Sequence, residues 1–129
     1  MESIKIDIGF IPCFQDPEKL SRLNHLIKVN SDLMLHQVMA GTGCSIDPSF
    51  QVLLLLYDLD YADPFIVVYH VSEPNEPIQF RPLLEGFPEL PLECPHCDEE
   101  ITDRTELRYD FLFQLKADNI EMVISTDAE

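Results

Sequence analysis

Positively charged residues are scarce in this sequence. Eight lysines and arginines stand against 24 aspartates and glutamates, which gives a formal net charge of −16 over 129 residues. Such a surface repels the phosphates of nucleic acids and the headgroups of anionic membranes, and it favours a basic partner. We therefore predict that the partner is another protein with a basic surface, with no direct contact to nucleic acid or membrane.

Long apolar runs and cysteines are also few. No stretch approaches the ~18 apolar residues that a transmembrane helix needs, and no basic segment with an apolar run behind it lies near residue 1. These absences predict a cytoplasmic protein. The cysteines are too sparse for a disulfide scaffold, so reduced thiols or one metal site are the two options. They are Cys13, Cys44, Cys94 and Cys97.

The hydrophobic share of 46% is large enough for one core, so we predict a single domain over residues 1–129. Its central stretch is a helix followed by a strand. Asp47 is a good N-cap, and Pro48 suits the first position of a helix that ends near Asp60. The β-branched and aromatic run at residues 65–69 then predicts a strand that is covered on both sides.

Two more helices and a strand are predicted before this stretch. Alternating isoleucines predict a strand over residues 4–10. Asp16 and Pro17 are typical of a helix start, and an amphipathic stripe follows them. Ser31 can cap a further helix, which Gly41 and Gly43 end.

Six prolines interrupt residues 72–95 and allow regular elements of a few residues at most. A short edge strand is predicted at residues 78–80. Apolar residues in this segment predict that it is ordered, and we interpret some of them and their acidic neighbours as partner contacts, or alternatively as cover for an edge of the sheet. The candidate contact residues are Leu83, Leu84, Glu85, Phe87, Glu89 and Leu90.

Residues 96–129 are predicted to close the chain with a hairpin. Residues 107–115 alternate cleanly between apolar and polar, residues 117–119 are turn formers, and Ile120, Met122 and Ile124 form the partner strand. The predicted fold class is α+β: a three-helix unit on a mostly antiparallel sheet, ending in a β-hairpin.

The order of elements over residues 16–71 resembles a winged helix, in which the helix at residues 48–60 would be the DNA-reading one. That helix would have to supply cations to phosphates, yet no lysine or arginine occurs between Lys28 and Arg81. The lack of cations therefore favours a winged-helix-like scaffold that contacts proteins. Winged-helix modules with a CPxC turn before a hairpin resemble accessory domains of prokaryotic conflict and defence systems.

The sequence Cys94-Pro95-His96-Cys97 has three interpretations. It is similar to the CPHC motif of thioredoxin-fold disulfide oxidases, although the acidic residues 98–100 would raise a thiol's pKa. It also resembles one knuckle of a zinc ribbon, with Cys94 and Cys97 as metal ligands and Asp98 in place of the usual glycine. Further ligands would have to come from Cys13, Cys44, His70, His96 or a second subunit. The third interpretation is a knuckle-shaped turn without metal.

We therefore expect a non-catalytic adaptor or accessory subunit, for example of a bacterial defence system, with no cofactor unless zinc is bound. One alternative is an acidic mimic of nucleic acid that inhibits a DNA- or RNA-binding protein. Another is a CPHC thiol-disulfide oxidoreductase. The pattern leaves homo-oligomerisation open.

Overall fold

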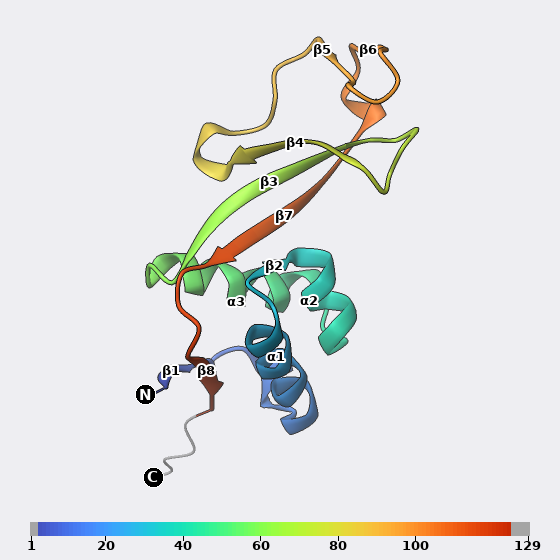
Figure 1. Cartoon of the computed structure of the whole chain (residues 1–129). Coiled ribbons are helices and arrows are strands. Elements are labelled where there is room, and N and C mark those ends of the chain that lie inside the picture. Colours follow the sequence, from blue (N-terminus) through green and yellow to red (C-terminus); the bar gives the residue numbers. More distant parts are fainter. Residues whose placement is uncertain (1–2, 125–129) are drawn as a thin grey trace. The chain divides into compact units, whose positions relative to one another are not determined.

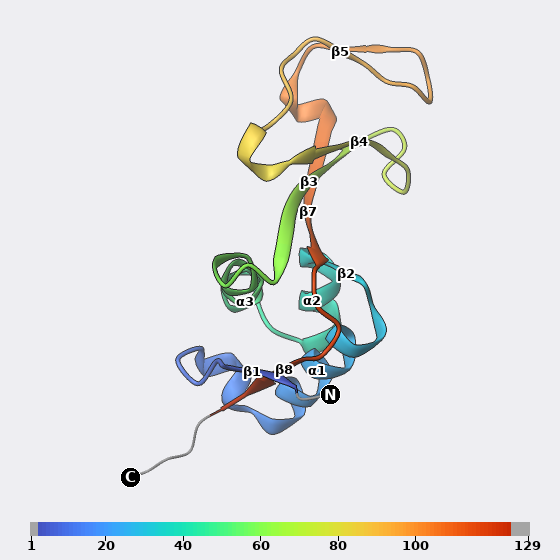
Figure 2. The ribbon, with the colours of Figure 1, turned by 60° about the vertical axis from the view of Figure 1, so that its left-hand side comes forward.

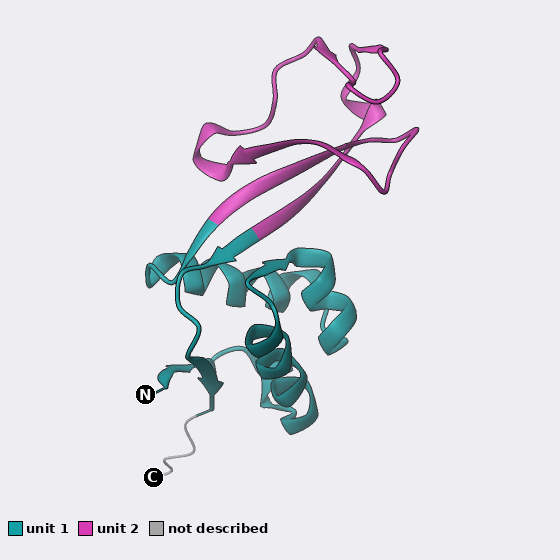
Figure 3. Ribbon diagram, viewed as in Figure 1, with its two compact units in different colours: residues 1–63, 113–129 teal, residues 64–112 magenta. Residues whose placement is uncertain are grey.

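The computed structural model describes residues 3–124, which fall into two compact units (Figure 3). Unit 1 comprises described residues 3–63 and 113–124, and unit 2 comprises residues 64–112. The boundaries differ from the predicted divisions at residues 16–71, 72–95 and 96–129. That the chain forms a single domain stays a prediction, which calorimetry can test by asking whether both units unfold in one transition.

All three α-helices lie in the first half of the chain, and the second half consists of strands and short 3-10 helices (Figures 1 and 2). In chain order the elements are β1 (Ile4–Asp7), the 3-10 helix η1 (Pro12–Gln15), α1 (Pro17–Val29), β2 (Asp32–Met34), α2 (Leu35–Thr42), α3 (Ile46–Asp58), β3 (Ala62–His70), β4 (Pro77–Pro82), the 3-10 helix η2 (Leu83–Glu85), β5 (Leu92–Glu93), β6 (Glu100–Ile101), the 3-10 helix η3 (Arg104–Glu106), β7 (Leu107–Leu115) and β8 (Ile120–Val123). The α+β class with three α-helices is confirmed.

Helix α1 begins as the sequence predicts. The Asp16 side chain accepts a hydrogen bond of 2.9 Å from the backbone N–H of Glu18, and Pro17 occupies the first helical position. The helix approaches α2 closely, because a Cβ placed on Gly41 would lie 2.8 Å from a methyl carbon of Leu26. Gly41 therefore lies inside α2 and serves packing, whereas Gly43, with a φ of 80°, is the C-cap that ends the helix as predicted.

The starts of the next two helices were predicted wrongly. Ser31 does not cap α2, because residues 32–34 form strand β2 first and the helix begins at Leu35. Helix α3 begins at Ile46 with Ser45 as its N-cap, so Asp47 lies in the first turn instead of at the cap. Pro48 is still tolerated there, since the first turn of a helix has backbone N–H groups without intrahelical partners.

The main sheet has the strand order β2-β7-β3-β4, which places β4 at an edge as predicted. Strands β3 and β4 are antiparallel, with Val67 opposite Phe80. Strand β7 has the predicted bounds, and β3 buries three consecutive residues, as expected for a strand covered on both sides.

The two strands predicted to end the chain, β7 and β8, are both present. The partner of β8, however, is β1, which it pairs in parallel with Ile6 opposite Met122. The side chain of Asn24 in α1 donates to the Met122 carbonyl at 2.9 Å and accepts from its N–H at 2.7 Å. Asn24 thus satisfies backbone groups of β8 that a neighbouring strand would otherwise bond.

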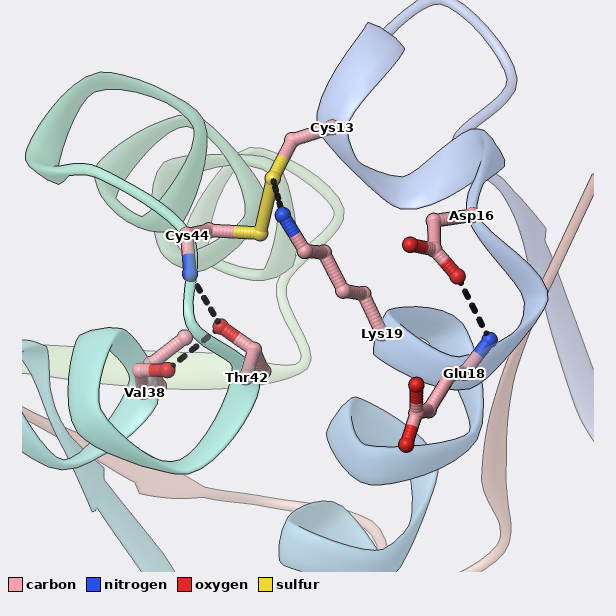
Figure 4. Close-up of a disulfide and its surroundings, with 7 residues drawn as sticks. All are labelled: Cys13, Asp16, Glu18, Lys19, Val38, Thr42 and Cys44. Atoms are coloured by element: carbon pink, nitrogen blue, oxygen red, sulfur yellow. Dashed lines mark hydrogen bonds between the residues drawn. A yellow bond between two sulfur atoms is a disulfide. The ribbon is translucent and has the colours of Figure 1, made fainter.

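Two of the four cysteines form a disulfide, which corrects the prediction of reduced thiols or a single metal site. Cys13 in η1 is bonded to Cys44, just beyond α2 (Figure 4). The Cys44 turn is held by Thr42, whose hydroxyl donates to the Val38 carbonyl at 2.7 Å and accepts from the Cys44 N–H at 3.2 Å. The sequence did not indicate that Cys13 and Cys44 pair. They are 31 residues apart, and packing of the intervening helices brings them together.

Candidate functional site

The proline-rich segment after β4 is fixed by two arginines. Arg81 donates from Nε to the Gly86 carbonyl at 3.0 Å, and Arg104 donates to the Pro88 carbonyl at 3.1 Å. Gly86 has a φ of 79°, a conformation that favours glycine, and it ends the single turn of η2. The segment is therefore an ordered part of unit 2, as the sequence predicts.

The six candidate contact residues separate into two groups. Leu83 and Leu90 pack against the buried cluster of unit 2. Leu84 is 81% exposed and Phe87 is 47% exposed. Their acidic neighbours Glu85 and Glu89 are exposed as well. The first pair thus covers the core, whereas the other four residues face solvent.

The exposed side chain of Phe87 is held in place by an aromatic contact. Its ring lies 4.8 Å from that of Tyr109 at an interplanar angle of 71°, an edge-to-face arrangement. The Tyr109 hydroxyl accepts a hydrogen bond from Arg104 at 3.2 Å. The ring of Phe87 is therefore presented in a fixed position.

The CPHC motif lies in the turn between β5 and β6, which pair as a two-stranded antiparallel ribbon. The backbone of Cys94 bonds to two residues of this turn: its N–H donates to the Glu99 carbonyl and its carbonyl accepts from the Asp98 N–H, both at 2.9 Å. Asp98 has a φ of 62°, in the left-handed region. It thus takes the conformation for which a zinc knuckle commonly uses glycine.

The turn brings two thiols to a histidine. The ligand atoms of His70, Cys94 and Cys97 all lie within 4.8 Å of one another. Cys94 and His70 are buried, and Cys97 is partly buried. The distance between His70 Nδ1 and Cys97 Sγ is 3.5 Å, and the Ser72 hydroxyl lies 2.9 Å from the same nitrogen. Three potential ligand atoms for a metal ion are therefore together in unit 2.

Glu99 and His96 lie beside this cluster. The Glu99 carboxylate is 3.5 Å from Cys97 Sγ. The Glu99 backbone N–H lowers the pKa of the Cys97 thiol, but desolvation and the side chains of Cys94 and Glu99 outweigh it, so the net pKa is raised. His96 is exposed, and its Nε2 lies 3.2 Å from the Pro77 carbonyl.

The structure narrows the set of further metal ligands that the sequence left open. Cys13 and Cys44 are consumed by their disulfide, and His96 is outside the cluster. His70 belongs to it, although it lies 24 residues before Cys94 at the end of a different strand. A lone histidine in a strand gives no such signal, because β5 and β6 form a separate ribbon, and only its packing with β3 in the buried cluster of unit 2 brings the cysteines to His70.

The surroundings of the CPHC turn differ from those of a thioredoxin-fold site. There the first cysteine lies at a helix N-terminus, which stabilises its thiolate. Here residues 98–99 and strand β6 follow Cys97. The helix dipole that lowers a reactive thiol's pKa is thus missing from this turn.

A depression of about 510 Å³ lies in unit 1, and its titratable lining residues are Lys28, Lys116 and Asp118. Lys116 donates to Asp60 at 2.7 Å and lies 3.6 Å from Asp63. The hydrogen bond to Asp60 raises the pKa of Lys116, and the charges of both aspartates act in the same direction. A lysine held in its protonated form does not serve as a general base.

Comparison with protein-family models, curated proteins and solved structures gives no match. The resemblance to winged-helix accessory domains therefore stays a prediction. Within residues 3–124, no helix is long and apolar enough to cross a membrane.

Proposed function

We propose that the protein is a non-catalytic protein-binding module, an adaptor or accessory subunit, that docks through the exposed residues Leu84 and Phe87. The observation that carries this proposal is their exposure on a segment that is otherwise tied down. Burying a leucine or phenylalanine side chain contributes about 1.5–3 kcal/mol, so two such anchors supply a useful part of a binding free energy.

The charge around these anchors identifies the chemistry of the partner. Unit 2 contains 11 acidic and three basic residues, which gives a net charge of −8. Two of the three cations, Arg81 and Arg104, are engaged with backbone carbonyls of the same segment. The partner surface that fits is an apolar pocket with a basic rim, because opposite charges at the rim accelerate association and buried apolar groups provide affinity.

The fixed position of the anchors supports the same proposal. A side chain that is already ordered loses less conformational entropy when it binds. Phe87 is held against Tyr109, and the turn that carries Leu84 is held by Arg81. The resemblance to accessory domains makes a defence complex of the native host the first place to look for the partner.

Capture of host proteins on the immobilised chain tests this proposal. We compare wild type with Leu84→Asp and with Ile46→Asp, a matched control because Ile46 is 52% exposed in unit 1. We expect to capture a partner whose affinity falls at least 10-fold with Leu84→Asp and stays unchanged with Ile46→Asp.

Salt separates this mode of binding from charge mimicry. At about 1 M salt the Debye length falls to about 3 Å, so attraction between surface charges is largely screened. A partner that survives this salt and depends on Leu84 supports an apolar docking surface. A partner that is lost in high salt and binds both variants equally contradicts it and favours the nucleic-acid mimic.

A further inference from the structure

We propose that His70, Cys94 and Cys97 bind one Zn²⁺ ion that fixes the turn between β5 and β6 to the end of β3. This inference is independent of the proposed protein-binding function. It rests on distances, burial and backbone geometry within unit 2.

The separations of the ligand atoms fit a zinc ion. Zinc binds histidine nitrogen at about 2.0–2.1 Å and cysteine sulfur at about 2.3 Å, so a tetrahedral site holds such a pair about 3.6 Å apart. His70 Nδ1 and Cys97 Sγ are 3.5 Å apart. All three ligand atoms lie within 4.8 Å of each other, so small side-chain rotations suffice to place them around one ion.

The chemistry of the cluster selects zinc over the common hard cations. Two sulfurs and one imidazole nitrogen are soft or borderline ligands, which suit Zn²⁺ and not Mg²⁺ or Ca²⁺. Binding would release the two thiol protons to solvent and leave two thiolates on the metal. Cys94 is fully buried and belongs to the apolar cluster of unit 2, so the site is closed on that side.

The backbone of the turn has the form of a metal knuckle. The Cys94 carbonyl accepts from the Asp98 N–H, the Cys94 N–H donates to the Glu99 carbonyl, and Asp98 takes the left-handed conformation. In this turn the two cysteine sulfurs lie within 4.8 Å of each other and of the His70 ring nitrogen. The Glu99 carboxylate lies 3.5 Å from Cys97 Sγ but is not within reach of all three ligand atoms, so these residues supply three of the four ligands of a tetrahedral site. Ser72, which now contacts His70 Nδ1, must turn away from that nitrogen when the metal binds.

Unit 2 also has a physical need for such an ion. It spans 49 residues, and its buried cluster consists of Ile66, Val68, Cys94, Ile101 and Leu107. Units of this size commonly depend on a metal or a disulfide, because their cores are too small to offset the conformational entropy lost on folding.

Cobalt titration of the full chain tests the proposal. The protein is purified without oxygen and treated with chelator, and a thiol assay in denaturant should find two free thiols, since Cys13 and Cys44 are paired. We expect one equivalent of Co²⁺ to produce tetrahedral d–d bands and a thiolate charge-transfer band. One equivalent of Zn²⁺ should abolish both.

Two variants distinguish the ligands from their neighbours. Cys97→Ser should weaken metal binding by at least about 10-fold, whereas His96→Gln in the same turn should leave it unchanged. Circular dichroism of each metal-free variant checks that it folds. Zinc should also increase hydrogen-exchange protection of amides in unit 2 and leave those of unit 1 as they were.

Three results would overturn the assignment. One is folded protein with two free thiols that takes up no cobalt in stoichiometric amount. Another is a cobalt spectrum without thiolate charge transfer. The third is equal loss of binding in Cys97→Ser and His96→Gln.

Discussion

The two units carry the same net charge but differ in the interactions available to stabilise them. Each has a net charge of −8, but unit 2 concentrates it in 49 residues. Among the described residues, 17 buried apolar side chains belong to unit 1 and six to unit 2. Unit 1 has helices, a large core and a disulfide, whereas unit 2 has short strands, prolines and a cluster of two thiols and a histidine. We infer that each unit uses its own cysteine pair as a local cross-link.

Removal of the disulfide is expected to have the largest effect on unit 1. The Cys13–Cys44 bond closes a loop of about 31 residues, which stabilises the folded state by about 3–4 kcal/mol in the chain-entropy model. Replacement of both cysteines by alanine should lower the free energy of unfolding by that amount. Denaturant unfolding measures it.

Hydrogen exchange on the same variant sharpens the comparison. The amides of α1 and α2 should lose protection, and the metal affinity of unit 2 should stay unchanged. A variant that loses metal affinity as well would show that the cysteine pairs are not local to their units.

A smaller effect is expected at the start of α1. Asp16→Ala removes the side chain that accepts from the Glu18 N–H, and the loss of such a cap costs about 1 kcal/mol. Asp16→Asn keeps the acceptor and should be nearly neutral. Thermal unfolding of the two variants distinguishes them, and equal destabilisation by both would contradict a capping role.

The smallest effect is a pH dependence in unit 2. Asp103 caps η3, and the hydrogen bond from the Thr105 backbone N–H lowers the pKa of its carboxyl. Because the folded pKa lies below the unfolded value, the stabilisation is present above the unfolded value and is lost as pH falls through the folded pKa. The Thr105 amide resonance should follow this titration in NMR spectra.

Asp103→Asn is the control for this titration, since asparagine keeps the acceptor without a charge. Its Thr105 amide should show no shift over the acidic range. A shift that persists in this variant would assign the titration to another group.

Local signals in the sequence were sufficient where the interaction is local. Asp16 and Pro17 start α1 through bonds within three residues, and the alternation of residues 107–115 predicted β7 with its observed bounds. The predicted starts of α2 and α3 were wrong. The residues after Ser31 form β2 before α2 begins, and α3 begins at Ile46, one residue before the predicted cap Asp47.

The candidate sites show the same division. Cys94 and Cys97 were recognisable because their spacing is a local motif, and the exposed acidic and apolar residues between β4 and β5 were recognisable as a segment. The sequence could not separate Leu84 and Phe87 from Leu83 and Leu90, because burial depends on what covers each side chain. The sequence likewise could not show that His70, and not His96, lies beside Cys94 and Cys97.

The sequence by itself determined the α+β composition, the anionic character, the ordered proline-rich segment and the turn that holds two thiols. These follow from periodicity, charge and backbone preference, which act over a few residues. Only the tertiary structure decided the Cys13–Cys44 bond, the pairing of β8 with β1 and the meeting of His70 with the two thiols. Those contacts join residues that are far apart in the chain, and their formation depends on how all the intervening elements pack.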